Sequence, residues 1–316
     1  MQPMHAPTRD QRGSGETISQ YARIARDYVT SYYRARSERA SFQTIATYCM
    51  FIGHARSGHS IMGALLDAHP NVILPDEVDA LRYVAAGFRR EQIFHLLLER
   101  SRKQARKGRT KGGRNGKRYS YAVPGQWQGR FSTLKVIGDS KAGKSTQRFA
   151  SNPALLHRLE RCMAGIDVKL IHVIRNPYDN ISTLMLRGGR TFENAITQYF
   201  QNCSALAAIR SGLDSAKLLT VRQEDLIVQP GNTLRALCAF LGIDAPEEYV
   251  QVCAGILYAA VPKSRYSVAW SDASIDLVRR KIEQFDFLAG YAYDDEDVNQ
   301  ACDEIAAAAV TPPGGC

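Results

Sequence analysis

Long hydrophobic runs, paired cysteines and metal-binding histidine motifs are all missing from this sequence of 316 residues. No apolar run approaches the roughly 20 residues of a transmembrane helix, and residues 1–16 are polar, so we expect neither a membrane span nor a signal peptide. The seven cysteines are scattered without a C-x-x-C pair, and the seven histidines lack metal-ligand spacing. These absences predict a cytoplasmic protein with reduced thiols, without a zinc site or a disulfide framework.

Acidic residues are missing between Arg100 and Arg118, a segment whose ten Lys and Arg residues match the whole formal net charge of +10. The segment is rich in Gly and poor in apolar residues, which predicts a solvated, flexible basic insert over residues 100–118. It is either a plain surface loop or a lid that attracts an anionic acceptor or cofactor. Because no nucleic-acid-binding motif and no interleaved aromatic residues accompany the charge, we expect no binding to nucleic acid.

One large core suits a chain with 45% hydrophobic and 9% aromatic residues. We expect an N-terminal helical extension at residues 1–46, a single α/β domain at residues 47–292 and a fraying tail at residues 293–316. Within the extension, Tyr and aliphatic residues recur at helical spacing over residues 18–40, opposite many Arg residues. We expect this helix to pack on the domain or on a second copy of the chain in a homo-oligomer.

A strand, a glycine-bounded loop, a helix and a second strand come one after another in the pattern of an anion-binding βαβ unit. They lie at residues 47–52, 53–58, 60–66 and 72–74. Backbone N–H groups in such a loop, at the N-terminus of a helix, bind phosphate or sulfate, and Arg56 adds a positive charge. A right-handed crossover between parallel strands would bring Glu77, just after the second strand, to the same edge of the sheet.

A second candidate anion site comes after residues 168–174, an apolar run that predicts a strand buried on both faces. Arg175 is the next residue after this strand, at the end where ligands bind in open α/β sheets. A hydroxyl stands seven or eight residues later, at Ser182 or Thr183. Three further short motifs, used below as landmarks, occur later in the chain: LLTVRQEDL at residues 218–226, FLGI at residues 240–243 and KSR at residues 263–265.

In order and spacing, these landmarks resemble the sulfotransferases that use 3′-phosphoadenosine 5′-phosphosulfate (PAPS), over about residues 48–290. The first motif, which continues into LDAHP at residues 66–70, is most similar to that of the tyrosylprotein sulfotransferases. The resemblance implies a three-layer, P-loop-like α/β fold with a central parallel sheet flanked by helices. It also implies that PAPS is the cofactor and that adenosine 3′,5′-bisphosphate (PAP) is a product.

The resemblance implies cofactor-binding residues by position. Those for the 5′-phosphosulfate are Arg56, Ser57, Gly58, His59 and Ser60, with His59 where the family has a hydroxyl. Those for the 3′-phosphate are Arg175, Thr183 or Ser182, and the late basic loop Lys263, Ser264 and Arg265. Gln223 replaces a Tyr that helps the tyrosylprotein enzymes to bind adenine, so the contact with the base is open.

The predicted catalytic residues are Glu77, Arg56 and Lys141. Sulfuryl transfer to an acceptor hydroxyl passes in line through an SO₃-like state while negative charge grows on the leaving phosphate, so positioning and fixed positive charge do most of the work. Arg56 and Lys141, or Lys144 in place of Lys141, would supply that charge, and a partly buried Glu77 would take the acceptor's proton. The transferred group carries a single charge, so we expect no metal to be needed. The acceptor stays open between peptide tyrosine, carbohydrate, lipid and small molecule.

Residues 138–145, GDSKAGKS, match the nucleotide-binding pattern G-x-x-x-x-G-K-[ST] and come after a strand-like segment at residues 134–137. The pattern supports an alternative, a P-loop kinase or nucleotide hydrolase, which also needs an acid on a neighbouring strand to hold Mg²⁺. The next strong strand ends in Arg175 and Asn176, so a sulfotransferase is the preferred interpretation. A catalytically inactive nucleotide-binding module is a further alternative.

Overall fold

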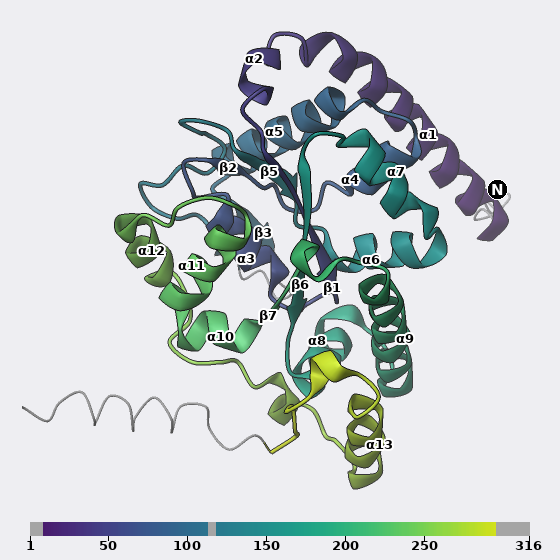
Figure 1. Ribbon diagram of the computed structural model, residues 1–316. Coiled ribbons are helices and arrows are strands. Elements are labelled where there is room, and N and C mark those ends of the chain that lie inside the picture. The colour runs from purple at the N-terminus through teal and green to yellow at the C-terminus, as the bar shows by residue number, and fades with distance from the viewer. Residues whose placement is uncertain (1–8, 113–117, 295–316) are drawn as a thin grey trace, which may run out of the picture.

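The computed structural model describes residues 9–112 and 118–294. A sheet of five strands, in the order β2-β5-β1-β6-β7, runs through the middle of the molecule (Figure 1). The strands are β1 (Thr47–Gly53), β2 (Val72–Ile73), β5 (Val136–Asp139), β6 (Asp167–Ile174) and β7 (Leu218–Arg222). Every pairing between them is parallel, so their carboxyl ends lie along one edge of the sheet.

β1 is buried on both faces and divides the core in two. Because side chains alternate along a strand, Tyr48, Met50 and Ile52 join one hydrophobic cluster, whereas Cys49 and Phe51 join the other. The helices that complete the Cys49 cluster are α3 (His59–Leu66), α10 (Gln223–Val228), α11 (Pro230–Phe240) and α12 (Glu247–Ala254). Those that complete the Tyr48 cluster are α4 (Ala80–Ala85), α5 (Arg90–Arg106), α7 (Ala154–Cys162), α8 (Pro177–Gly188), α9 (Phe192–Ser211) and α13 (Asp272–Ile282). The structure confirms the predicted three-layer α/β fold with a central parallel sheet.

The βαβ unit expected around the glycine-bounded loop is present, with one strand inserted into it. β2 pairs with β5 and not with β1, so α3 crosses over β5 on its way from β1 to β2. α6 (Ala142–Ser151) starts just after β5. The segments that leave β1, β5 and β2 are therefore neighbours at the carboxyl edge of the sheet.

The basic segment differs from the expected flexible insert over residues 100–112. α5 continues to Arg106, and a short antiparallel hairpin pairs β3 (Thr110–Gly112) with β4 (Arg118–Ser120). Arg109 is buried and forms an ion pair with Asp67, which also accepts hydrogen bonds at 2.8 Å from the Ser101 hydroxyl. Burial raises the pKa of the Asp67 carboxyl, and the Arg109 charge opposes that rise. A buried carboxylate thus fixes part of a segment whose local composition predicts solvation. Residues 113–117 lie outside the described residues.

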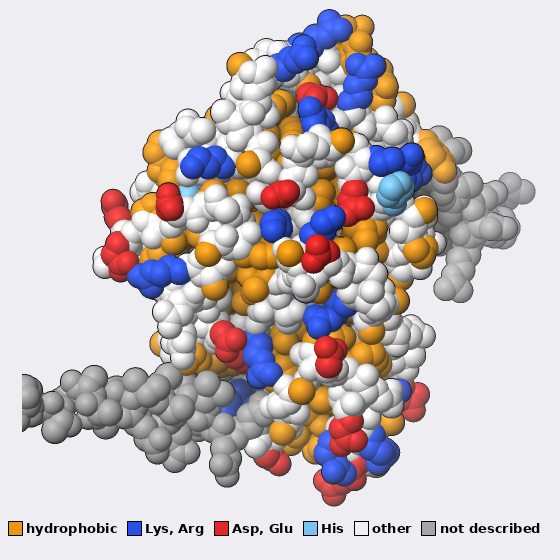
Figure 2. All heavy atoms as spheres, viewed as in Figure 1, with side chains coloured by type: hydrophobic (Ala, Val, Ile, Leu, Met, Phe, Trp, Pro, Cys, Tyr) orange, Lys and Arg blue, Asp and Glu red, His pale blue; other side chains and the backbone are white. Residues whose placement is uncertain are grey.

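The N-terminal helix α1 (Arg9–Arg34) packs along α5 of the same chain and is followed by the short α2 (Arg39–Phe42). The Gln92 amide of α5 donates to the Tyr28 carbonyl at 2.9 Å, and the Tyr83 hydroxyl donates to Asp27 at 2.9 Å. Of the helices that the structure describes, none has the length and apolar character needed to cross a membrane. Figure 2 shows basic and acidic side chains interspersed over the viewed face. Apart from Tyr293 and Asp294, the predicted tail at residues 293–316 lies outside the described residues.

Candidate active site

The glycine-bounded loop begins at Gly53, which closes β1 with a φ of 133°. A Cβ atom at this position would lie 2.8 Å from the Val173 carbonyl oxygen, so a side chain does not fit there. The Gly53 N–H donates to the Thr146 hydroxyl on α6 at 2.9 Å, and the Asn202 amide on α9 donates to the Gly53 carbonyl at 2.9 Å. Two helices from distant parts of the sequence therefore fix the start of the loop.

The loop ends at Gly58, the N-cap of α3, with a φ of 93°. A Cβ atom at Gly58 would lie 2.6 Å from Cγ of Gln223, so this glycine lets the Gln223 side chain pack on the loop. The Ser57 hydroxyl is buried and donates to the His54 carbonyl at 2.9 Å, which holds the loop closed. The amides at this end meet the positive end of the α3 dipole, the arrangement that favours an anion.

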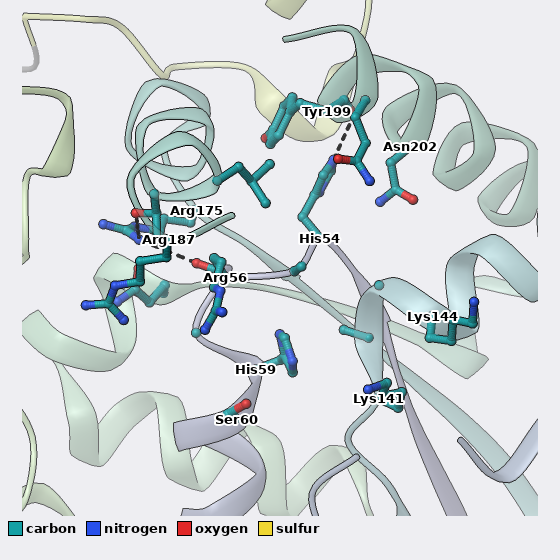
Figure 3. A pocket seen from close by; sticks show the side chains of 18 of the residues that line it. His54, Arg56, His59, Ser60, Lys141, Lys144, Arg175, Arg187, Tyr199 and Asn202 are labelled. Carbon is teal, nitrogen blue, oxygen red and sulfur yellow. Dashed lines mark hydrogen bonds between the residues drawn. The ribbon is translucent and has the colours of Figure 1, made fainter. Parts of the chain in front are cut away.

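One cavity of about 1060 Å³ joins most of the predicted site residues. From the first motif it is lined by Arg56, Gly58, His59 and Ser60, but not by Ser57. From the other segments it is lined by Glu77, Lys141, Arg175, Thr183 and Ser264, but not by Ser182, Lys263 or Arg265. In Figure 3, Arg175 and Arg187 lie on one side of the loop, and Lys141 and Lys144 lie on the other.

Glu77 and Lys141 come after neighbouring strands, β2 and β5, and meet at the cavity. Nζ of Lys141 lies 3.3 Å from Oε2 of Glu77, whose side chain is 47% exposed. Glu77 is thus an ion-paired, half-exposed carboxylate, more open to solvent than the partly buried base expected from the sequence. Lys144 lies one turn further along α6, so the structure brings Lys141 and not Lys144 beside Glu77.

The backbone around Glu77 is tightly held. The buried Asp139 carboxylate accepts hydrogen bonds from the backbone N–H groups of Val78 at 3.1 Å and Ala80 at 2.7 Å. Glu77 itself has a φ of 60°, and Arg56 has a φ of 69°. Non-glycine residues rarely adopt this left-handed conformation, and where they do the strain often marks a functional site. Of the four described non-glycine residues with a positive φ, Arg56 and Glu77 line this cavity, whereas Asp79 and Arg109 do not.

Arg175 is 6% exposed and forms the centre of a second polar cluster. Its Nη1 donates to the Thr183 hydroxyl at 3.2 Å, and its Nη2 donates to the Pro262 carbonyl at 2.8 Å and the Ser264 hydroxyl at 3.0 Å. Nη1 also reaches the Arg56 carbonyl at 3.4 Å, which links this cluster to the glycine-bounded loop. Burial lowers the pKa of the guanidinium, and the nearby Asp179 and Glu224 charges oppose that change.

Thr183, and not Ser182, is the hydroxyl beside Arg175. Ser182 is buried and accepts a hydrogen bond from Nε1 of Trp270 at 3.1 Å, on the side of α8 away from the cavity. The prediction that either hydroxyl binds the cofactor therefore narrows to Thr183. A spacing of eight residues alone does not decide between adjacent positions, because they face different sides of a helix.

Arg265 does not line the cavity, contrary to the role expected from the late basic loop. It is 1% exposed, and its guanidinium donates to the buried Asp179 carboxylate at 2.8 Å. The Arg265 backbone N–H also donates to Asp179 at 2.8 Å. This pair fixes the loop on α8 so that Ser264 reaches Arg175, which makes Arg265 a positioning residue. Lys263 lies outside the lining as well.

A polar network holds the segment that follows β6, and its central residue, Glu224, belongs to the landmark at residues 218–226. The Glu224 carboxylate accepts hydrogen bonds from the Asn176 backbone N–H and from the Tyr291 hydroxyl, both at 2.8 Å. The Asn176 side chain caps α8 by accepting from the Tyr178 N–H, and Pro177 takes the first helical position. Burial raises the pKa of Glu224, and the hydrogen bond from Asn176 opposes that rise.

The sequence prediction names neither Arg187 nor His54 as a site residue and leaves the role of Gln223 open, although all three line the cavity. Arg187 lies four residues after Thr183 on the same helix, so helical spacing could have identified it. Gln223 is buried, and its Oε1 has no hydrogen-bond partner among the described residues. His54 is buried against Tyr199, with ring centroids 4.0 Å apart, and burial lowers its pKa to about 4. The landmark at residues 218–226 contains Gln223, but no local pattern gives the contacts of Gln223 or His54, because their neighbours come from distant segments.

The nucleotide-binding pattern at residues 138–145 does not form a phosphate-binding loop. β5 includes Gly138 and Asp139, and α6 begins at Ala142, which leaves only two residues between strand and helix. A Cβ atom at Gly138 would lie 1.9 Å from the Cys49 carbonyl oxygen, so packing between strands explains this glycine. The structure thus gives no support to a kinase or nucleotide hydrolase built on this segment.

Within the described parts of the chain, His59, Asp76 and Glu77 form a group with potential metal-ligand atoms, all within 4.8 Å of one another. Residue spacing did not reveal it, because the loop and the segment after β2 bring these residues together. Asp76 is buried and accepts a hydrogen bond from the Ser60 hydroxyl at 3.2 Å. The group is a polar cluster beside the loop, and Nζ of Lys141 lies 3.3 Å from its Glu77 carboxylate.

Comparisons with known proteins matched the chain to one sequence family and to several solved structures. The sequence model described as the Sulfotransferase family matches residues 50–247. Among curated proteins, no sequence matches the chain. The structure is similar to that of a sulfotransferase from Mycobacterium avium, at 11% sequence identity, 81% coverage of each chain and a TM-score of 0.46. It is also similar to a sulfotransferase from Alicyclobacillus acidocaldarius, at 14% identity, with 76% of this chain and 94% of the other covered and a TM-score of 0.43. A mouse sulfotransferase complexed with PAP has 12% identity, coverage of 82% and 89%, and a TM-score of 0.40. None of these comparisons distinguishes the tyrosylprotein branch.

Proposed function

The chain belongs to the sulfotransferase family, and we propose that it transfers a sulfuryl group from PAPS to an acceptor hydroxyl. One observation carries the proposal: an anion-binding loop, a buried Arg cluster and a Glu–Lys pair line the same cavity. The first two features suit the two phosphate-bearing ends of the donor, and the third suits proton removal from an acceptor. The catalytic unit would comprise residues 47–292, with the described part of the helical extension, residues 9–46, packed on it.

The two anion sites would divide the donor between them. The loop amides, with Arg56, Gly58, His59 and Ser60, would hold the 5′-phosphosulfate at the N-terminus of α3. Arg175, Thr183 and Ser264, which already form one hydrogen-bonded cluster, would hold the 3′-phosphate. Arg187 would add a solvent-exposed charge on the same side. The link from Arg175 to the Arg56 carbonyl supports a fixed distance between the two sites.

Gln223 is our candidate for the contact with the adenine base. Its side chain packs on Gly58, and its buried Oε1 lacks a partner among the described residues. A buried acceptor without a partner is costly, and the adenine amino group would satisfy it. This contact would take over the part that Tyr plays in the tyrosylprotein enzymes.

The Glu–Lys pair suits the transfer step. The acceptor oxygen would form a bond to sulfur as the bond from sulfur to the bridging phosphate oxygen breaks, giving a sulfate ester and PAP. Glu77 would take the acceptor's proton, and Arg56 and Lys141 would stabilise the charge that grows on the bridging oxygen. In the structure, Lys141 is paired with Glu77. Lys141 would also contact the bridging oxygen of the bound donor, beside the Glu77 carboxylate that acts as base.

We propose that these cations replace a metal in the reaction. Arg56 and Lys141 already match the charge of the departing phosphate. The His59, Asp76 and Glu77 group is the place where a divalent cation would otherwise bind. Unchanged turnover in the presence of EDTA is the expected result.

Thermal unfolding with PAP and with ATP plus Mg²⁺ tests the proposal. PAP should raise the melting temperature by several degrees at concentrations well above Kd, because a ligand that binds only the native state stabilises it. ATP with Mg²⁺ should have a much smaller effect, since it lacks the 3′-phosphate. A larger shift with ATP and Mg²⁺ would favour a nucleotide hydrolase and overturn the proposal.

A further inference from the structure

Beyond the loop, the cavity continues between one face of α6 and one face of α9. The lining residues Lys144, Gln147 and Ser151 recur at helical spacing along α6, and Gln198, Gln201 and Asn202 do so along α9. Figure 3 shows Lys144 and Asn202 on the side of the loop opposite to Arg175 and Arg187. We call this part of the cavity the α6–α9 limb. It starts beside Lys141, so an acceptor bound there would have a hydroxyl within reach of Glu77.

The size of the cavity leaves room for an acceptor beside the donor. Its volume of about 1060 Å³ lies just above the roughly 300–1,000 Å³ found for sites that hold one small molecule. The donor would fill the part between the loop and Arg175. The α6–α9 limb is therefore available to a second molecule of moderate size.

The chemistry of the limb is that of a hydrogen-bonding site. Four of its side chains carry an amide or a hydroxyl group: Gln147, Ser151, Gln198 and Gln201. A fifth polar side chain, Asn202, already donates from Nδ2 to the Gly53 carbonyl. Each amide offers both donors and an acceptor, which suits vicinal hydroxyls. Oε1 of Gln198 is buried and has no hydrogen-bond partner among the described residues, so a donor from a ligand would satisfy it. The apolar lining from these two helices is small and consists of Ala142, Ala150 and Ala205, together with the buried Tyr199.

Charge adds a second feature. Lys144 is exposed at the wall of the limb, and within the described residues no carboxylate forms an ion pair with it. Neither helix contributes an acidic residue to the lining. A positive charge with hydrogen-bonding neighbours favours an anionic group on the ligand.

We propose that the α6–α9 limb is the acceptor site and that the acceptor is a carbohydrate bearing an anionic group. The inference rests on the proposed sulfotransferase function. A phenol or a steroid needs apolar walls that this limb lacks, and a tyrosine side chain would leave most of its amides without partners. A sugar with several hydroxyls satisfies these amides, and its carboxylate or sulfate lies against Lys144.

Acceptor competition tests the inference. The purified full chain is incubated with ³⁵S-labelled PAPS and, separately, with a hexasaccharide that contains glucuronic acid, its carboxyl-reduced counterpart, 4-nitrophenol and a tyrosine peptide. We expect kcat/KM to be highest for the acidic hexasaccharide, about tenfold above its reduced counterpart, because one charge-assisted hydrogen bond is lost. Lys144→Met should bring the two sugars within threefold of each other while the KM for PAPS is unchanged.

The amide variants report on the sugar hydroxyls. Gln147→Leu and Gln201→Leu should each raise the KM for both sugars about tenfold, without changing the melting-temperature shift caused by PAP. Gln284→Leu, an exposed position outside the cavity lining, is the matched control and should change neither quantity. The assignment of the limb would be overturned if the KM for each sugar were the same in Lys144→Met, Gln147→Leu and Gln201→Leu as in the control Gln284→Leu and the wild type.

The failures of the two proposals are distinguishable. If PAP does not stabilise the chain and no acceptor is labelled, the proposed function fails and the inference fails with it. If PAP stabilises the chain but 4-nitrophenol or the tyrosine peptide has the highest kcat/KM, the proposed function stands and the carbohydrate inference is wrong.

Discussion

Replacing Arg175 by Met should remove the preference of the protein for a nucleotide with a 3′-phosphate. The guanidinium is 6% exposed and directs Nη1 and Nη2 to Thr183 and Ser264, which line the cavity with it. A phosphate in this cluster would receive charge-assisted hydrogen bonds, each worth about 1.5–3 kcal/mol. We therefore expect Arg175→Met to weaken PAP binding by about 2–3 kcal/mol, roughly 30- to 160-fold in Kd.

The assay is a thermodynamic cycle by isothermal titration calorimetry, with PAP and AMP as ligands and the wild type and Arg175→Met as proteins. AMP lacks the 3′-phosphate, so its Kd should change less than threefold. Because Arg175 also donates to the Pro262 carbonyl, Arg175→Met will disturb the nearby loop, and the AMP titration measures that disturbance. Thr183→Val is a milder variant, with an expected loss of about tenfold for PAP alone.

Arg279→Met, an exposed position on α13 that lies outside the cavity lining, is the control and should leave both Kd values unchanged. An equal loss of affinity for PAP and AMP in Arg175→Met would refute the assignment of the 3′-phosphate to this cluster.

Three further predictions concern the stability of the fold, its pH dependence and the contact with the adenine base. Arg109→Met leaves the buried Asp67 carboxylate without its cation and should lower the free energy of unfolding by about 3–5 kcal/mol. Lys107→Met, in the same basic segment but exposed, should change the free energy of unfolding by less than about 0.5 kcal/mol. Urea unfolding followed by circular dichroism measures both values, and equal effects of the two variants would contradict the structural role of Arg109. His54 has its pKa lowered from 6.5 to about 4 in the folded chain, so the unfolded chain binds more protons between these values and stability must fall as the pH drops through them, by about 3 kcal/mol. His54→Gln should remove that part of the fall in urea midpoints between pH 7 and pH 4.5, and an unchanged slope would show that other groups cause it. Gln223→Leu should weaken PAP binding about tenfold and abolish discrimination against the inosine analogue of PAP, and retained discrimination would mean that another group contacts the base.

The sequence predicted the layers of the fold well, because burial on both faces leaves a clear local signal. The apolar residues of β1 and β6 mark strands inside a parallel sheet, and glycines that need a positive φ or a close contact mark the loop. Arg175, directly after β6, was placed correctly at the carboxyl edge on the same reasoning. Features that depend only on local pattern and strand order could therefore be predicted from the residues alone.

Side-chain direction and long-range pairing could not be predicted in the same way. Ser182 and Thr183 are adjacent in sequence, yet only Thr183 lines the cavity, because α8 turns Ser182 toward Trp270. Arg265 looks like a ligand-binding cation in sequence, and its buried partner Asp179 lies 86 residues away. Arg109 was assigned to a solvated segment for the same reason. In each case a buried partner from a distant segment decides the role of the residue.

The state of Glu77 is a further feature that only the structure gives. Its position after β2 was predictable from the crossover rule, but its ion pair with Lys141 depends on β5 lying between β1 and β2. The pairing places the proposed base directly beside the proposed cation.

The central claim is that Glu77 removes the acceptor's proton in a cavity that binds PAPS. Transfer of ³⁵S from PAPS to the preferred acceptor by wild type and Glu77→Gln, together with calorimetric Kd values for PAP, tests it most directly. We predict that Glu77→Gln lowers kcat by a factor of about 10²–10⁴ and leaves the Kd for PAP within threefold of the wild-type value. A wild-type kcat in Glu77→Gln would contradict the claim.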